Sequence, residues 1–251
     1  MRSQHAAAIL CLVTFIIGAA IALGASYGRQ FGLWDYETGL KILGPGVALG
    51  IIGVLSGVLW LARALFGNNS AGWRYGAVGL AGSLLLTYIP LNHLWLYVSS
   101  PPIHDISTDI EYAPPFVALL PLRAGAPNGP EYDGPRKVIY KGRTMNTAYA
   151  QKLAYPEIKT AGLLSRTDVI FWRAVERAKS AGWNVVTFNE KTGSIEATNT
   201  FFWFGLVSDI SIRVKPAGKL GTRLDIRAKS RTGENDMGMN AGLVRSFVKS
   251  L

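Results

Sequence analysis

Three long apolar runs within the first hundred residues constrain this chain more than any other feature. Residues 6–25, 42–62 and 75–98 contain no Asp, Glu, Lys or Arg. Each run has about the 20 residues that a helix needs to cross a hydrocarbon core of roughly 30 Å. A soluble protein would have to bury three such helices in succession, none with a polar face. The runs therefore predict an integral membrane protein with a three-helix transmembrane anchor over residues 1–98.

The first run has a second interpretation as a cleaved signal peptide. Arg2 precedes it, and the small residues Gly24, Ala25 and Ser26 mark its end. Its 20 apolar residues exceed the apolar core of about 7–15 residues that is usual in signal peptides. We therefore expect a retained helix.

A stripe of glycines marks the second run. The spacing of these four residues is i, i+4, i+7 and i+11, which places them on one face of a helix: Gly46, Gly50, Gly53 and Gly57. Small residues allow helix backbones to approach closely in a membrane. The stripe predicts helix packing within a three-helix bundle.

The basic residues near the runs predict the orientation. Arg2 at the N-terminus and Arg63 and Arg74 between the second and third runs have no acidic neighbours in those segments. The other connecting segments mix basic and acidic residues or are acidic where they leave the third run. Since positive segments stay on the cytoplasmic side, we expect a cytoplasmic N-terminus and an external C-terminal domain.

The rest of the chain has a different composition. Residues 101–251 contain 21 of the 26 Lys and Arg residues and 14 of the 16 Asp and Glu residues. Residues 99–135 are rich in Pro and Gly, which predicts an extended tether. Residues 136–251 are expected to form a soluble domain, which begins with the basic stretch 136–143.

The pattern of apolar residues in this domain predicts an α+β fold. Helical spacing appears around residues 171–178 and again over 243–251, whereas residues 183–189 and 194–204 are rich in strand-forming residues. Residues 209–215 and 224–231 alternate strictly between apolar and polar side chains, which buries one face of a strand and solvates the other. We expect a four-stranded antiparallel sheet covered by helices on one face.

The alternating strands carry a candidate anion-binding surface. If they pair, five basic side chains emerge on one solvated face: Arg213, Lys215, Arg227, Lys229 and Arg231. Arginine suits phosphate and carboxylate groups. The alternative is an ordinary solvated face that Asp209 and Asp225 partly neutralise. We expect that replacing Arg227 and Arg231 by Gln leaves the thermal midpoint nearly unchanged and weakens the natural interaction. A large drop in the midpoint would mean that the arginines are structural and pair with Asp209, Asp225 or Asp236.

A cluster of polar residues after the third run is a weaker candidate site. Asp105 and Asp109 could hold a hard cation such as Ca²⁺ or Mg²⁺ through their oxygens. The alternative is a turn-forming polar linker. Three histidines and one cysteine in the whole chain cannot assemble a zinc site with several His and Cys ligands in the soluble part. No recognised catalytic motif is present, so we expect no cofactor.

The closing segment, residues 227–240, carries a resemblance to a known family. Its sequence, RAKSRTGENDMGMN, resembles the R-S-x-S-R-x-G-x-S-D-L-G-x-N pattern of domain of unknown function 1499. Ala228 and Asn235 each replace a serine of that pattern. Further pieces between residues 103 and 204 fit the same family, and the three-span anchor looks like its bacterial membrane-bound version. The resemblance implies one domain and a bacterial envelope protein, and it implies no reaction.

These observations predict a bacterial inner-membrane protein with a periplasmic domain. We expect a non-catalytic binding or accessory protein whose partner is an anionic envelope component, such as an anionic lipid, or a membrane-protein complex. Nucleic acid is not an expected partner, because the domain lies outside and no basic motif of the usual kinds is present. The alternative is an enzyme acting on an envelope lipid or glycan through Asp105, Asp109 and Arg227 or Arg231.

Overall fold

The computed structural model describes residues 2–66, 72–218 and 221–251, with side chains from His5 onward. The side chain of Arg2, used in the orientation argument, lies outside the described residues. The chain forms two compact units. The first contains Met1–Trp95 with Phe202–Gly205, and the second contains Leu96–Phe201 with Leu206–Leu251.

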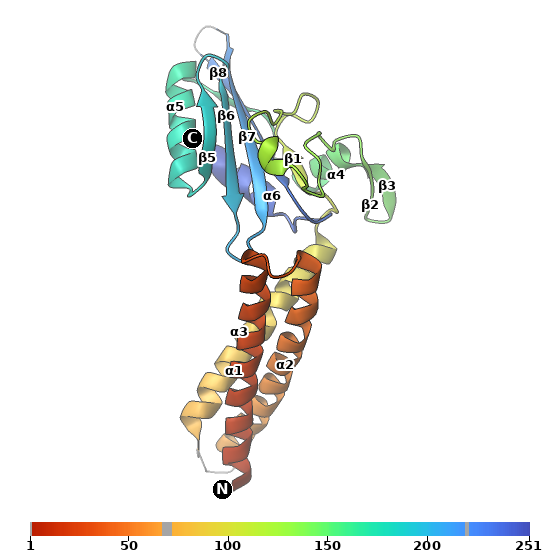
Figure 1. The fold of residues 1–251 in the computed structure, drawn as a ribbon, viewed down its shortest axis with the longest axis vertical. Helices are drawn as coiled ribbons and strands as arrows, with labels where there is room; N and C mark the ends of the chain where they lie inside the picture. The colour runs from red at the N-terminus through yellow and green to blue at the C-terminus, as the bar shows by residue number, and fades with distance from the viewer. Residues whose placement is uncertain (1, 67–71, 219–220) are drawn as a thin grey trace. The chain divides into compact units, whose positions relative to one another are not determined.

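Three helices account for the apolar runs (Figure 1). They are α1 (Arg2–Gln30), α2 (Tyr36–Phe66) and α3 (Trp73–Ser99). By length and apolar composition, each is able to cross a membrane, which fits a membrane protein.

The glycine stripe of α2 faces the other two helices. All four glycines are buried. A Cβ atom added to Gly46 would come within 2.9 Å of the Gly18 carbonyl oxygen of α1. A Cβ added to Gly53 would collide with the side chain of Ser83 in α3. The small residues therefore let the three helices approach within one molecule.

The second unit is built on an antiparallel sheet, so the α+β prediction is confirmed. Four long strands correspond to the four predicted ones: β5 (Asn184–Asn189), β6 (Ser194–Thr200), β7 (Val207–Ala217) and β8 (Gly221–Ser230). Two short strands, β1 (Asp105–Ser107) and β4 (Ala161–Leu163), both pair with β8, and the order is β1-β8-β7-β6-β5. The sequence patterns missed both short strands, because three residues show no periodicity.

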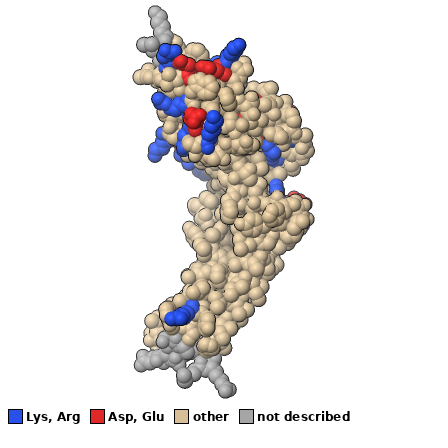
Figure 2. Space-filling view, turned by 60° about the vertical axis from the view of Figure 1, so that its left-hand side comes forward, with Lys and Arg blue, Asp and Glu red and all other residues tan. Residues whose placement is uncertain are grey.

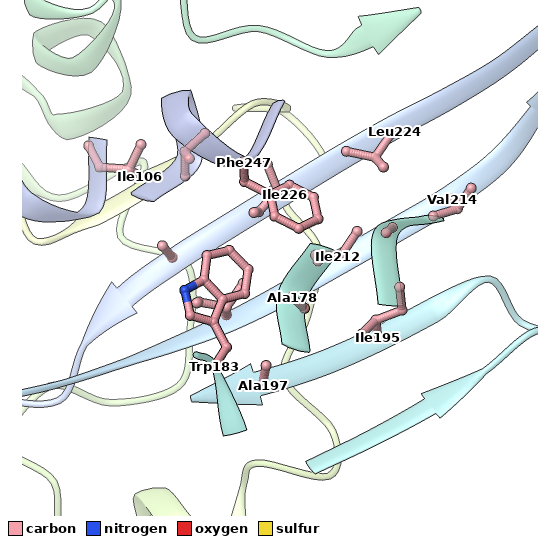
Figure 3. Close-up of a cluster of buried hydrophobic side chains, with 14 of the residues drawn as sticks. Ile106, Ala178, Trp183, Ile195, Ala197, Ile212, Val214, Leu224, Ile226 and Phe247 are labelled. Atoms are coloured by element: carbon pink, nitrogen blue, oxygen red, sulfur yellow. The ribbon is translucent and has the colours of Figure 1, made fainter. Parts of the chain in front are cut away.

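Two helices cover one face of this sheet, α5 (Thr167–Ser180) and α6 (Met239–Lys249) (Figure 1). Between them and the strands lies the apolar core (Figure 3). Cross-strand neighbours such as Ile195, Ile212 and Ile226 point into it from β6, β7 and β8. Trp183, the residue before β5, stacks on Phe247 of α6 with ring centroids 5.0 Å apart. This face is the one that the alternation placed inside.

The opposite face of the sheet is covered as well, by residues 108–136, which contain the short 3-10 helix η1 (Pro121–Arg123) (Figure 1). The predicted extended tether is therefore not separate from the domain. Ile103, Ile106, Phe116 and Leu119 are buried, and the whole segment belongs to the second compact unit. Its Pro and Gly residues indicate irregular backbone, which side chains of the sheet hold in place.

A small subdomain completes the second unit. The strands β2 (Lys137–Tyr140) and β3 (Arg143–Asn146) form a separate two-stranded hairpin, and α4 (Thr147–Ala154) follows directly. Lys141 and Gly142, in the turn, both have positive φ angles, as a tight two-residue hairpin turn requires. Asn146 caps α4 by accepting a hydrogen bond from the Tyr149 amide.

Candidate functional site

The polar face of the sheet gathers the charged residues that the sequence singled out. Neighbouring strands place Asp105, Lys229 and Asp209 in one cross-strand row and Asp225 opposite Arg213 in another. Opposite charges therefore alternate across the sheet. We call the charged side chains on this face of β7 and β8, together with the groups of residues 104–136 that contact them, the buried polar layer.

Arg227 lies at the centre of the buried polar layer and is only 2% exposed. Its Nε and Nη2 atoms donate to the two oxygens of Asp105 over 2.9 and 2.8 Å, a bidentate ion pair. Nη2 also donates to the carbonyl oxygens of Pro130 and Glu131. The guanidinium lies over the Phe116 ring, 4.4 Å from its centroid. The ion pair, the carbonyl acceptors and the aromatic ring together stabilise a charged arginine side chain inside the fold.

Lys229 continues the same cluster. Its Nζ lies 3.0 Å from an oxygen of Asp133 and 3.5 Å from Asp105, and it donates to the Glu131 carbonyl. His104 Nε2 lies 2.7 Å from the other oxygen of Asp133. Although burial raises the pKa of Asp133, its bonds with His104 and Lys229 outweigh that effect and hold the pKa well below its usual range.

A second ion cluster forms around Asp209, whose side chain is fully buried. Arg123 donates to it over 2.5 Å, and Arg231 makes a bidentate pair at 2.9 and 2.8 Å. Arg123 comes from η1, so this cluster attaches the covering segment to β7. Burial lowers the pKa of Arg123, while Asp209 raises it.

The third cluster joins two aspartates to two arginines. Arg213 and Arg223 each contact both Asp109 and Asp225, at distances from 2.5 to 3.0 Å. Burial raises the pKa of Asp109, but the amides of Tyr112 and Glu111 and both arginines lower it below its ordinary value. Arg223 was not among the predicted site residues, although it lies in the same alternating strand.

Glu196 is the most informative residue that the sequence did not reveal. Its carboxylate accepts hydrogen bonds from three consecutive amides, those of Val117, Ala118 and Leu119. It is 4% exposed. A single glutamate in a strand gives no sign of this role, because the backbone that it binds lies about 80 residues earlier.

The closing motif ends in a cap for α6. The carboxylate of Asp236 accepts hydrogen bonds from the amides of Gly238 and Asn240, both over 2.9 Å. Asn235 caps the preceding turn by accepting from Met237. Burial raises the pKa of Asp236 to about 6, against the lowering effect of those amides. The N-cap residue of α6 is Gly238, which has no side chain to accept a hydrogen bond. The expectation that Asp236 or Asn235 caps this helix therefore holds only in part: Asp236 is not the N-cap residue, but its carboxylate binds the first-turn amide of Asn240.

The expectation of a solvated basic face is wrong for most of its members. Arg227 and Lys229 are buried, Arg213 and Arg231 are half-buried in ion pairs, and only Lys215 is exposed. Replacing Arg227 and Arg231 by Gln is therefore not neutral for stability. The error came from assuming that water covers the polar side of an alternating strand, whereas residues 108–136 cover it. Asp209 and Asp225 do neutralise the arginines, as the alternative interpretation expected.

The candidate metal ligands Asp105 and Asp109 belong to different clusters. Asp105 binds Arg227, and Asp109 binds Arg213 and Arg223. Within the described ranges, no group of three or more His, Cys, Asp or Glu residues is arranged to hold a metal ion. The carboxylate oxygens on which the metal prediction depended instead bind cationic side chains of the domain itself.

Exposed charge lies elsewhere. Figure 2 shows Lys and Arg side chains gathered on the surface of the sheet-containing part, while the apolar helices carry almost none in that view. Residues 134–156 form a stretch of this part that contains basic residues and no acidic one. Its five basic residues are Arg136, Lys137, Lys141, Arg143 and Lys152. All but Arg136 are exposed.

Comparison with known proteins gives one result for the C-terminal part. Residues 138–251 match the model of a family described as "Protein of unknown function (DUF1499)". The match covers the hairpin β2–β3 and every later strand and helix of the sheet domain. No curated protein matches the chain.

Proposed function

We propose that this chain, which belongs through residues 138–251 to the DUF1499 family of proteins of unknown function, functions in binding rather than in catalysis. The protein is a non-catalytic binding or accessory protein of the bacterial envelope, anchored in the inner membrane by α1–α3. Its partner is an anionic component of the envelope. A neighbouring membrane-protein complex is the other outcome that the experiment below can give.

One observation carries this proposal. The carboxylates and arginines that could do acid–base or electrostatic chemistry are bonded to one another within the buried polar layer. Such ion pairs stabilise a particular arrangement of the chain, and their carboxylates, those of Asp105, Asp109, Asp209 and Asp225, are buried. The exposed surface instead carries an excess of Lys and Arg, which suits an anionic partner.

The alternative enzyme would use Asp105, Asp109, Arg227 and Arg231. Both oxygens of Asp105 accept hydrogen bonds from Arg227, and both oxygens of Asp109 accept hydrogen bonds as well. A general base needs a lone pair within reach of the substrate proton. The arrangement favours a structural role for these residues.

The proposed location requires a periplasmic domain. We expect a C-terminal alkaline phosphatase fusion to be active and a C-terminal green fluorescent fusion to be dark, because basic segments stay in the cytoplasm. Adding two lysines after Ser99 should weaken this bias and serves as a control for the charge argument. The opposite fusion pattern would contradict the proposed orientation, and cytoplasmic molecules would then be candidate partners.

The binding role is tested by purifying the full chain in mild detergent. We expect anionic lipid or another anionic envelope molecule to be enriched over the bulk membrane, as measured by mass spectrometry. Stoichiometric recovery of membrane proteins without such enrichment would favour the accessory role. Recovery of neither would contradict a binding function.

A further inference from the structure

The exposed hairpin β2–β3 is the strongest unexplained feature of the second unit. Lys137 and Ile139 lie on the same side of β2, and Ile139 is 71% exposed. Lys141 occupies the turn and Arg143 begins β3. Among the described residues, none forms an ion pair with Lys137, Lys141 or Arg143, whereas the arginines of the buried polar layer are all paired.

The turn of this hairpin lies beside the end of α3. Together they line an open cavity of about 330 Å³, to which Tyr97–Ser100 and Pro102 contribute on one side. Ile139, Tyr140 and Lys141 contribute on the other side, with Asn235 from the closing motif. All of these residues belong to the second compact unit.

The end of α3 also marks where the chain leaves the membrane. The candidate span is Trp73–Ser99, so residues 97–100 fall at the boundary between hydrocarbon and water. Tyr97 is half-exposed and Val98 is 70% exposed. Tyrosine is enriched at this boundary because one end of its ring is apolar and the other polar.

We infer that this cavity and the basic hairpin bind the headgroup of an anionic phospholipid from the bilayer that holds α3. The phosphate would meet Lys141, the basic residue that lines the cavity, and Lys137 and Arg143 would add positive charge from the two faces of the hairpin. Ile139 and Val98, which also line the cavity, would contact the first acyl carbons. Basic residues close to an anionic membrane surface are attracted to it, and the attraction grows with their number. The inference rests on the proposed function and names the partner and its site.

The hairpin also suits this role mechanically. Its turn is tight, with φ angles of 51° at Lys141 and 72° at Gly142. Val138 is buried in the core and anchors β2 from the opposite side. Lys141 Nζ lies over the Tyr140 ring, 5.3 Å from its centre, and this cation–π contact holds the ammonium group in place. The cations are therefore presented by a fixed element.

The test uses the full chain in mild detergent and native mass spectrometry. Phosphatidylglycerol and phosphatidylcholine with identical acyl chains are titrated separately. We expect the wild-type protein to retain phosphatidylglycerol about tenfold more strongly, with the preference falling as ionic strength rises. The hairpin variant K137Q/K141Q/R143Q should lose the preference. A matched variant, K191Q/K215Q/K249Q, removes three exposed lysines elsewhere and should keep it.

Several outcomes would overturn the inference. These are equal retention of both lipids by the wild type, an equal loss in both variants, or full competition by equimolar glycerol phosphate, which would indicate a site for free anions. An unchanged thermal midpoint must accompany the loss in the hairpin variant. If that variant loses phosphatidylglycerol but still enriches another anionic envelope component, the inference fails and the proposed function stands.

Discussion

Replacing Arg227 by Gln is expected to lower the free energy of unfolding by about 3–5 kcal/mol, because it leaves the buried carboxylate of Asp105 without its bidentate partner. For a domain of this size, such a loss corresponds to a fall in the thermal midpoint of roughly 10 °C or more. Thermal unfolding of the full chain in detergent, followed by circular dichroism, measures the effect.

Arg143→Gln provides the matched control, since Arg143 is an exposed arginine of the same domain. Its expected effect is within about 0.5 kcal/mol. The double variant R227M/D105L should recover much of the lost stability, because removing both charges costs less than removing one. If R227Q behaves like the exposed control, the buried polar layer is not structural and a solvated anion-binding face is the better description.

Replacing Glu196 by Gln should have the second-largest effect, about 3 kcal/mol. Hydrogen bonds to a charged group are worth about 1.5–3 kcal/mol each, and the three amides of Val117–Leu119 all donate to this carboxylate. A glutamine would also point its own N–H₂ group at a backbone donor. Beyond the loss of global stability, the covering segment should detach more often.

Hydrogen exchange of the Val117, Ala118 and Leu119 amides measures that detachment directly. The expected result in the Glu196→Gln protein is faster exchange at these three amides than in the core strands β6–β8. Glu190→Gln is the control, because Glu190 is exposed in the β5–β6 turn. Unchanged protection of the three amides would show that the carboxylate is not what fixes the segment.

The two variants test one principle of this fold. The sheet has an apolar side covered by helices and a polar side covered by irregular chain. Irregular backbone leaves many N–H and C=O groups without partners, and these must be satisfied when they are buried. Glu196 and Arg227 satisfy them from the sheet, and Arg123 does so from within the covering segment. The bonds go to the amides of residues 117–119 and the carbonyls of residues 128–131.

Buried ion pairs of this kind favour specificity more than net stability. Desolvation of each charge offsets much of the attraction within a pair. What the pairs determine is which segment covers the sheet and in which register. A charged residue placed one position away would face the apolar core, because strand side chains alternate between faces.

The sequence alone determined the features that depend on local periodicity. Apolar runs of about 20 residues determined the three helices that are long and apolar enough to cross a membrane, because a bilayer of roughly 30 Å requires that length. Strict alternation in β7 and β8 determined which side chains form the core. The closing motif indicated that the Asp236 carboxylate binds the first turn of α6, because this contact lies within four residues, although the N-cap residue itself is Gly238.

Only the tertiary structure decided what covers the polar side of the sheet. Asp105 and Arg227 are 122 residues apart, and each alone has the composition of a solvated residue. Alternation shows that one side of a strand is polar, but water and a layer of oppositely charged side chains satisfy polar groups equally well. The choice between them depends on where residues 108–136 run, and that path has no periodicity from which it could be predicted.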